Sequence, residues 1–322
     1  MRKSGLPSEN KKDPYSVLMP VYHKENPEYF YRAAASMMEQ TASPDEFVLV
    51  CDGPLTEALE RQIERIRRKW PETLKVIRMP ECGGISLALA VGVEACRNEW
   101  IARMDSDDIA CTERCEKQMA FIQNRAREGK KLALLSGTIA EFASGSSEKR
   151  RADEDKTEQS AGLDDEKREL PDREQITGFR TLPCKYEEIL SYARRRNPMN
   201  HMAVMMRRSA VLAVGNYHPI QGAEDYDLWA RMIQAGYRAE NLPDVLVYAR
   251  TDNGMIGRRG GIAYARAALN LQRRFYQSGF LNFREYLLNC AVRVTASLMP
   301  HVLRQGLYRR KLRSKMSERY RN

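Results

Sequence analysis

The sequence predicts an α/β fold in which helices flank a mostly parallel sheet, followed by a helical extension. Between Tyr15 and Asp105, short apolar runs alternate with longer stretches of helical periodicity, giving four expected strands with a helix between each and the next. Strands that are joined by helices usually pair in parallel and are covered on both faces. From Arg258 onward the periodicity is that of amphipathic helices, which predicts the extension. With 322 residues, of which 43% are hydrophobic, the chain can build a substantial core.

Each expected element has its own signal. Asn26 and Pro27 are residues that cap and start a helix, and Gly236 is typical of a helix end. The expected strands are Tyr15–Tyr22, Glu46–Gly53, Leu74–Met79, Glu99–Asp105, Lys131–Phe142, His201–Met206 and Asp244–Arg250. The expected helices are Asn26–Gln40, Thr56–Trp70, Ile85–Cys96, Cys184–Arg196 and Glu224–Gly236.

The composition changes along the chain indicate its domain organisation. We expect a flexible amino terminus over residues 1–13, one α/β domain over 14–257 and a helical, basic extension over 258–322. Within the domain, a first half (about 14–142) and a second half (about 177–257) are separated by a charged insertion (about 144–176). From Ser144 to Gln175 the only large aliphatic residues are Leu163 and Leu170, so this stretch cannot bury enough apolar surface to become ordered.

Charge and cysteine content exclude several functions. The net charge is +10, but Leu303–Asn322 alone holds eight Lys or Arg residues against one Glu. The body is therefore nearly balanced, which argues against a nucleic-acid partner. We expect no membrane-spanning helix, no secretory signal and, from seven cysteines without a CxxC pair, no disulfide framework or zinc cluster. These observations favour a cytoplasmic location.

The stretch "WIARMDSDDIA" ends an expected buried strand in three carboxylates, Asp105, Asp107 and Asp108. Alternate residues of an extended segment point to the same side, so Asp105 and Asp107 should lie together. A hard divalent cation removes the repulsion between two such carboxylates and completes its coordination with substrate phosphates. The alternative interpretation is a solvated acidic turn or a helix cap.

Other polar residues also follow strands or begin helices. Asp52 could be a simple turn residue or could bind a nucleotide base or ribose. Gly84 lies at a helix start, where backbone N–H groups can meet phosphate. Glu224 and Asp225 lie in the first turn of a helix, where acids complement the helix dipole but could equally supply a general base. A lone histidine such as His201 is more often structural than functional.

Five of these stretches together resemble family 2 glycosyltransferases of the GT-A fold, and among them the enzymes of bacterial capsule, exopolysaccharide and O-antigen synthesis. The matching stretches are "SVLMPVYHKENPEYFYRAAASMMEQT", "EFVLVCDGPLT", "WIARMDSDDI", "NPMNHMAVMMRRSAV" and "GAEDYDLWARMIQAGYRAENLPDVLVYAR". They cover about Tyr15 to Arg250 apart from the insertion. The resemblance implies that 14–257 is a GT-A catalytic domain, with a nucleotide-sugar half over about 14–142 and an acceptor half over about 177–257. The pattern departs from the family in one segment, where Cys82, Ser86, Leu87 and Ala90 replace an Asn, Gly-rich, Lys and Asn series.

The resemblance implies a role for each matching position. Asp225 would be the catalytic base, and Glu224 would help to orient the acceptor. Asp107 and Asp105 would bind a divalent cation, Mn²⁺ or Mg²⁺. His201 and Asp108 would lie near the donor or acceptor sugar. The implied nucleotide-sugar-binding residues are Pro20, Val21, Tyr22, Glu25, Asp52, Gly84, Arg103, Asp105 and Ser106.

The expected activity is an inverting, metal-dependent transfer from a nucleotide-sugar, expected to be a UDP-sugar, to a lipid-linked cell-surface polysaccharide. The basic carboxyl terminus has the composition of an interfacial helix, in the stretch "LMPHVLRQGLYRRKLRSK". This composition suggests that the protein lies on anionic lipid at the inner face of the membrane. The alternative is a solvated tail. Two other interpretations of the whole chain compete with this one: a nucleotidylyltransferase, and a binding module that keeps the fold without catalysis.

Overall fold

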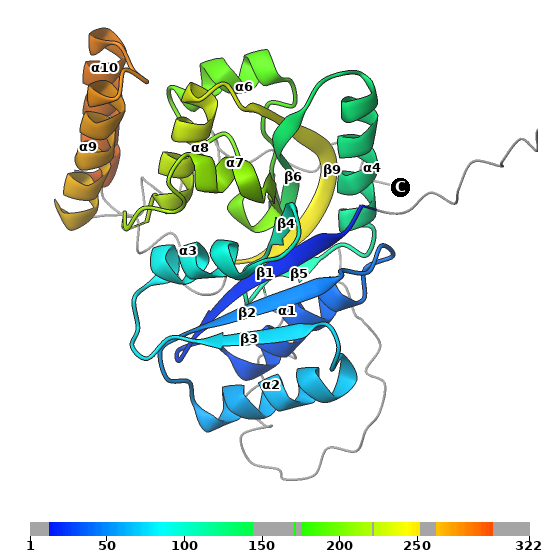
Figure 1. Cartoon of the computed structure of the whole chain (residues 1–322). Coiled ribbons are helices and arrows are strands. Elements are labelled where there is room, and N and C mark those ends of the chain that lie inside the picture. Colours follow the sequence, from blue (N-terminus) through cyan, green and yellow to red (C-terminus); the bar gives the residue numbers. More distant parts are fainter. Residues whose placement is uncertain (1–12, 144–170, 172–174, 221, 252–261, 299–322) are drawn as a thin grey trace, which may run out of the picture.

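The computed structural model describes residues 13–143, 171, 175–220, 222–251 and 262–298. The expected flexible amino terminus, most of the charged insertion and the basic tail lie outside the described residues. Figure 1 shows a central sheet with helices on both sides and two carboxyl-terminal helices at one edge.

One nine-stranded sheet organises the described chain, with the strand order β3-β2-β1-β4-β8-β6-β9-β5 and with β7 paired to β6. The strands are β1 (Tyr15–Tyr22), β2 (Glu46–Asp52), β3 (Leu74–Arg78), β4 (Trp100–Arg103), β5 (Ile109–Ala110), β6 (Leu132–Phe142), β7 (Ile176–Arg180), β8 (Met205–Arg207) and β9 (Arg238–Arg250).

The first half of the sheet is parallel, as predicted. β1 pairs in parallel with β2 and β4, and β2 pairs in parallel with β3. The predicted cap is also present, because Asn26 Oδ1 accepts hydrogen bonds from the backbone N–H groups of Glu28 (2.9 Å) and Tyr29 (3.2 Å). The connecting helices are α1 (Pro27–Met38), α2 (Glu57–Lys69) and α3 (Ile85–Ala95).

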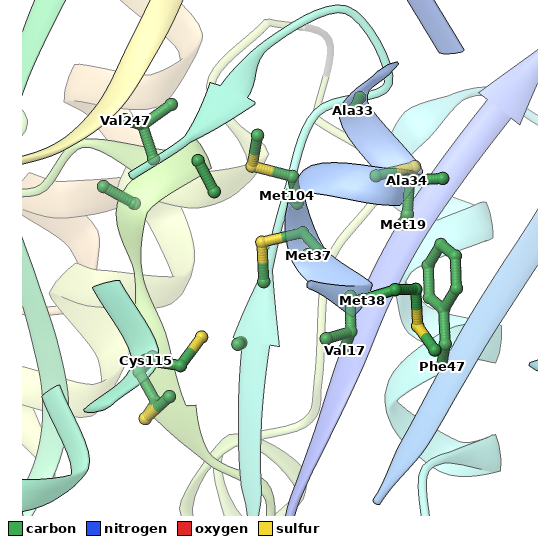
Figure 2. Close-up of a cluster of buried hydrophobic side chains, with 14 of the residues drawn as sticks. Val17, Met19, Ala33, Ala34, Met37, Met38, Phe47, Met104, Cys115 and Val247 are labelled. Atoms are coloured by element: carbon green, nitrogen blue, oxygen red, sulfur yellow. The ribbon is translucent and has the colours of Figure 1, made fainter. Parts of the chain in front are cut away.

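Each face of the sheet has its own core. Val17 and Met19 of β1 face the helices α1 and α2, whereas Leu18 faces α3, which is the period-two alternation of a strand. Figure 2 shows Met37 and Met38 of α1 packed toward Val17 and Phe47 of the sheet. Because both faces are covered, the polar ends of the strands are where a ligand can reach the sheet.

The second half of the sheet is mixed rather than parallel. β8 lies between β4 and β6 and is antiparallel to both, while β6 and β9 are parallel. The expected strand His201–Met206 is wrong at its start, because residues 201–203 form a short 3-10 helix. β9 begins six residues before the predicted strand. It passes through Pro243 because a register shift at Gly137 and Thr138 of β6 leaves Pro243 outside the ladder.

The remaining helices complete the two layers: α4 (Arg114–Arg127), α6 (Tyr186–Ala193), α7 (Arg208–Ala213), α8 (Glu224–Gln234), α9 (Ile262–Gln277) and α10 (Phe283–Leu298). As predicted, the carboxyl-terminal part is helical. α9 docks on α8, where the rings of Phe275 and Tyr226 lie 4.9 Å apart and Arg274 Nε lies 3.6 Å from an Asp227 carboxylate oxygen. None of the described helices is both long and apolar enough to cross a membrane.

Candidate active site

The acidic stretch forms a turn at the carboxyl end of the parallel strands. β4 ends at Arg103, two residues earlier than predicted, so Asp105, Ser106 and Asp107 lie in the turn and not in the strand. Ser106 Oγ donates to Glu25 Oε2 at 2.7 Å, which joins this turn to the loop after β1. Asp105 and Asp107 are partly exposed, whereas Ser106 and Asp108 are buried.

Arg103 is a buried cation under this turn. Its side chain is 1% exposed, and its Nη2 lies 2.5 Å from Asp105 Oδ1. Its Nε and Nη1 have no hydrogen-bond partner among the described residues. Arg114 of α4 fixes the position from below, because its Nη2 donates to the Arg103 carbonyl oxygen at 2.7 Å. A buried guanidinium with unused donors favours an anionic ligand at this place.

Asp108 anchors the turn to β9. Its Oδ1 accepts the backbone N–H of Arg250 at 2.8 Å, and Arg250 Nε donates to the Asp107 carbonyl oxygen at 3.1 Å. Burial, together with the charges of Asp107 and Asp105, raises the pKa of Asp108 well above the usual range. These contacts explain why the strand ends early, because they fold the acidic segment toward β9. Sequence reasoning missed Arg250, although its place at the end of an expected strand was a signal.

A second pair of carboxylates begins helix α8. Asn197 Nδ2 donates to Asp225 Oδ2 at 2.6 Å, and the backbone N–H of Tyr226 donates to Asp225 Oδ1 at 2.7 Å. Burial raises the pKa of Asp225. For Glu224, burial and the neighbouring charge of Asp225 raise the pKa to about 7. Glu224 Oε2 is buried and has no hydrogen-bond partner among the described residues.

The two acidic groups converge on one cation. Arg103 acts electrostatically on Glu224 and on Asp225, and Asp105 also acts on Glu224. The structure therefore brings the turn after β4 and the start of α8 into one electrostatic site, although they are far apart in the sequence.

Sequence reasoning also missed the residues that hold Asp225 in place. Arg180 of β7 donates from Nη2 to the Asn197 carbonyl oxygen (3.2 Å) and from Nη1 to Asn200 Oδ1 (2.7 Å). Asn197 is thereby held beside Asp225. The only sequence signal was the polar pattern "NPMN" between an expected helix and an expected strand.

His201 lies in the wall of the same site. Its Nε2 is 2.9 Å from Tyr217 Oη, and its ring meets Trp229 edge-on with centroids 5.9 Å apart. Burial and the charge of Arg103 lower the pKa of His201 well below the usual range, so the imidazole is neutral at physiological pH. Its contacts with Tyr217 and Trp229 give His201 a structural role, in addition to any contact with a sugar.

Asp52 and Gly84 meet at a separate point. The Asp52 carboxylate accepts the backbone N–H groups of Gly83 (2.7 Å) and Gly84 (3.0 Å) at the start of α3, so it binds the helix that it precedes. Tyr22, which is 37% exposed, is the register partner of Asp52. Pro20 and Val21 are buried behind them. No described contact joins Asp52 to the acidic turn.

The donor atoms at the turn suit a hard divalent cation. The partly exposed groups, Asp105 and Asp107, offer carboxylate oxygens, which Mg²⁺ and Mn²⁺ prefer. The described residues contain no ready-made cluster of three or more metal-binding side chains. A cation here would therefore need oxygen atoms from its ligand, which is how Mg²⁺ is bound with substrate phosphates.

Comparisons with known proteins agree on one family. The model of glycosyl transferase family 2 matches residues 16–161. The chain is 35% identical to an uncharacterized glycosyltransferase of Haemophilus influenzae, over 93% of this chain and 99% of that one. It is 31% identical to the amylovoran biosynthesis glycosyltransferase AmsE of Erwinia amylovora, over 91% and 97% of the two chains. It is 28% identical to the UDP-Gal:alpha-D-GlcNAc-diphosphoundecaprenol beta-1,3-galactosyltransferase of Escherichia coli, over 93% and 96%.

Solved structures show the same fold. The mannosyltransferase PcManGT of Pyrobaculum calidifontis, in complex with GDP-Man and Mn²⁺, has a TM-score of 0.57 and 16% identity, covering 94% of this chain and 82% of that one. Residues 1–349 of S. aureus TarS, in complex with UDP-GlcNAc, have a TM-score of 0.56 and 16% identity, covering 93% and 76%. The chain spans about half, 46%, of a longer TarS chain.

Proposed function

The chain belongs to glycosyltransferase family 2 and is a glycosyltransferase of the GT-A fold, and on this premise we propose that it transfers a sugar from a UDP-sugar to a lipid-linked acceptor, with inversion, during assembly of a cell-surface polysaccharide. Family membership sets aside the nucleotidylyltransferase alternative. Two relatives support the pathway and the acceptor: one is named for amylovoran biosynthesis, and another for transfer to a diphosphoundecaprenol-linked sugar.

One observation carries the proposal: two carboxylate groups with different surroundings face one buried arginine. The Asp105 carboxylate is paired with Arg103 and partly exposed, whereas Glu224 and Asp225 are held in burial with raised pKa values. Carboxylates held in different surroundings are suited to different tasks in one reaction. The first group suits a cation and a diphosphate, and the second suits proton transfer.

For donor binding, we assign the uracil ring to Asp52 and Tyr22 and the diphosphate to the acidic turn. Uracil presents an N–H donor, which a carboxylate oxygen accepts. Arg103 Nε and Nη1 supply unused donors to the diphosphate oxygens. Asp105 and Asp107 would hold a Mn²⁺ or Mg²⁺ ion together with those oxygens. When bound, the cation would offset the negative charge of the diphosphate leaving group.

For the transfer itself, we assign the base to Asp225. Its carboxylate accepts the proton of the acceptor hydroxyl, whose oxygen attacks the anomeric carbon from the face opposite the diphosphate. Asn197 keeps the carboxylate oriented through its 2.6 Å hydrogen bond. Glu224 contacts the acceptor through Oε2, which has no other partner in the described structure. His201, neutral and packed on Trp229, forms the wall beside the sugar.

The enzyme would work at the cytoplasmic face of the membrane, where a lipid-linked acceptor is presented. The composition of Leu303–Asn322, with eight basic residues against one acidic residue, supports attraction to anionic lipid, since each basic residue near such a surface contributes about 1 kcal/mol. This segment lies outside the described residues, so its sequence alone supports the assignment.

Two substitutions test the assignments directly. Asp225→Asn and Asp107→Ala should each lower sugar transfer to a lipid-linked acceptor to background while the thermal unfolding temperature stays within a few degrees of wild type. Asp244→Asn is the matched control, because Asp244 is half-exposed on β9 and its nearest cation, Lys117, is 3.9 Å away; it should keep full activity. Near-normal turnover of Asp225→Asn would show that the base assignment is wrong. Thermal stabilisation by a panel of UDP-sugars with and without Mn²⁺ identifies the donor.

A further inference from the structure

Helix α10 turns a mostly apolar side outward and packs polar residues against the protein. Its exposed positions all fall on one half of the helix circumference at 100° per residue. They are Phe283, Arg284, Leu287, Leu288, Ala291, Val292 and Thr295. Only one of these seven side chains is charged, whereas the side packed against the protein carries polar residues. A helix on the surface of a soluble domain shows the opposite arrangement.

The polar side of α10 is built into the protein. Asn289 is 7% exposed, and its Nδ2 donates to Gln272 Oε1 of α9 (3.0 Å) and to the Arg194 carbonyl oxygen (2.7 Å). Arg293 Nη2 donates to the Arg195 carbonyl oxygen at 3.2 Å. These hydrogen bonds fix the rotation of α10, so its apolar side is held outward and cannot turn into the core.

The apolar side is large for an exposed surface. Phe283, Leu287, Leu288 and Val292 are each 51–62% exposed, and they make up half of the eight large hydrophobic residues exposed in the described structure. In Figure 1 the α9–α10 pair lies at the outer edge of the molecule, where no described element covers it. Contiguous exposed apolar surface of this kind marks an interaction site.

The border of this surface is basic. Arg194, Arg195 and Arg196 are exposed and follow α6. The carbonyl oxygens of Arg194 and Arg195 accept the hydrogen bonds from α10 described above. α9 and α10 together contain five arginines and one acid, Glu285, which is itself paired with Arg194 at 3.2 Å. The sequence that continues from α10 ends in the basic segment Leu303–Asn322. An apolar helix face with a basic border is the pattern of a helix that lies in an anionic membrane interface.

We propose that the outer face of α10 (Phe283, Leu287, Leu288 and Val292), bordered by Arg194–Arg196, docks on an anionic lipid bilayer. A second copy of the chain fits this face poorly, because the two basic borders would repel each other. The inference rests on the proposed lipid-linked acceptor for its purpose, since Arg196 immediately precedes Asn197, which contacts Asp225. Docking through α10 would thus place the membrane next to the acceptor side of the site.

Vesicle flotation of the full chain tests the proposal. Wild type should bind vesicles of phosphatidylcholine with phosphatidylglycerol and bind phosphatidylcholine alone much more weakly. Leu287→Ser with Leu288→Ser should weaken binding to the mixed vesicles about tenfold or more, since each buried methylene adds to membrane affinity. Ile85→Ser with Leu87→Ser is the matched control: these α3 residues are 40% and 47% exposed and lie outside the proposed surface, so binding should not change.

Several outcomes would overturn the proposal. Wild type could fail to bind the mixed vesicles, could bind both lipid compositions equally, or could bind as well after the α10 substitutions as before them. Equal losses in the α10 and α3 variants would also contradict it. If sedimentation equilibrium showed a dimer that the α10 substitutions dissociate, the face would join two copies instead. The vesicles contain neither donor nor acceptor, so a failed transfer assay leaves this result unaffected. Unchanged circular dichroism shows that the variant is folded.

Discussion

Replacing Glu224 by glutamine should remove a pH-dependent cost of folding. Burial and the charge of Asp225 raise the pKa of Glu224 from the ordinary 4.5 to about 7. A raised carboxyl pKa means that the unfolded chain loses its proton at lower pH than the folded chain does. Wild type therefore loses stability as the pH rises from about 4.5 to about 7, and the loss is complete above that range. Glutamine cannot ionise, so Glu224→Gln avoids this loss.

The size of the effect follows from the two pKa values. At 1.36 kcal/mol per pH unit, a rise from 4.5 to about 7 corresponds to about 3 kcal/mol. The gain in the free energy of unfolding of Glu224→Gln over wild type should therefore be about 3 kcal/mol larger at pH 8 than at pH 4.

Urea unfolding at a series of pH values measures this difference. Glu113→Gln is the control of opposite sign, because Lys117 lowers the pKa of the exposed Glu113. That carboxylate stabilises the folded chain above its unfolded pKa, and the contribution is lost as the pH falls. Its replacement should therefore cost slightly more at pH 8 than at pH 4. A difference between Glu224→Gln and wild type that is constant from pH 4 to pH 8 would refute the reasoning.

Two further substitutions follow from the geometry. Asn197→Ala removes a hydrogen bond that favours the ionised form of Asp225. The rising limb of its pH–rate profile should therefore lie at higher pH than in wild type, and its transfer rate at neutral pH should be lower by about 10-fold or more. An unchanged pH–rate profile would contradict this. Gly53→Ala should lower the free energy of unfolding by about 1–3 kcal/mol more than Gly129→Ala does, as measured by denaturant titration. Both glycines have positive φ, but of the two only Gly53 has a backbone atom, Cys82 N, at 2.8 Å from an added Cβ. Equal losses of stability in the two variants would refute this explanation.

The parallel half of the fold was predictable because its signals are local. The Asn26 cap, the helical spacing of Leu59, Ile63 and Ile66, and the buried run of β2 each depend on neighbouring residues, and each is present in the structure. The antiparallel placement of β8 between β4 and β6 was not predictable in this way. It depends on pairing between segments that are far apart in the sequence, which no short pattern records.

The same limit applies to the site. Carboxylates after a strand, such as Asp105 and Asp107, can be noticed in the sequence because they follow an apolar run. The bond from Arg250 to Asp108 joins residues 142 positions apart, and the bond from Asn197 to Asp225 links a loop to a helix start. Likewise, the periodicity of α10 predicts a helix but does not say which side faces outward. The hydrogen bonds of Asn289 and Arg293 settle that.

The pairing of β6 with β7 makes the chain between them a natural place for engineering. Phe142 and Ile176 are register partners in adjacent antiparallel strands, so the intervening chain leaves and re-enters the sheet at one point. The entropy of closing such a loop grows only with the logarithm of its length, and doubling the length costs about 0.6 kcal/mol. Lengthening the chain between Phe142 and Ile176, for example by inserting an affinity tag, should therefore cost little loop-closure entropy.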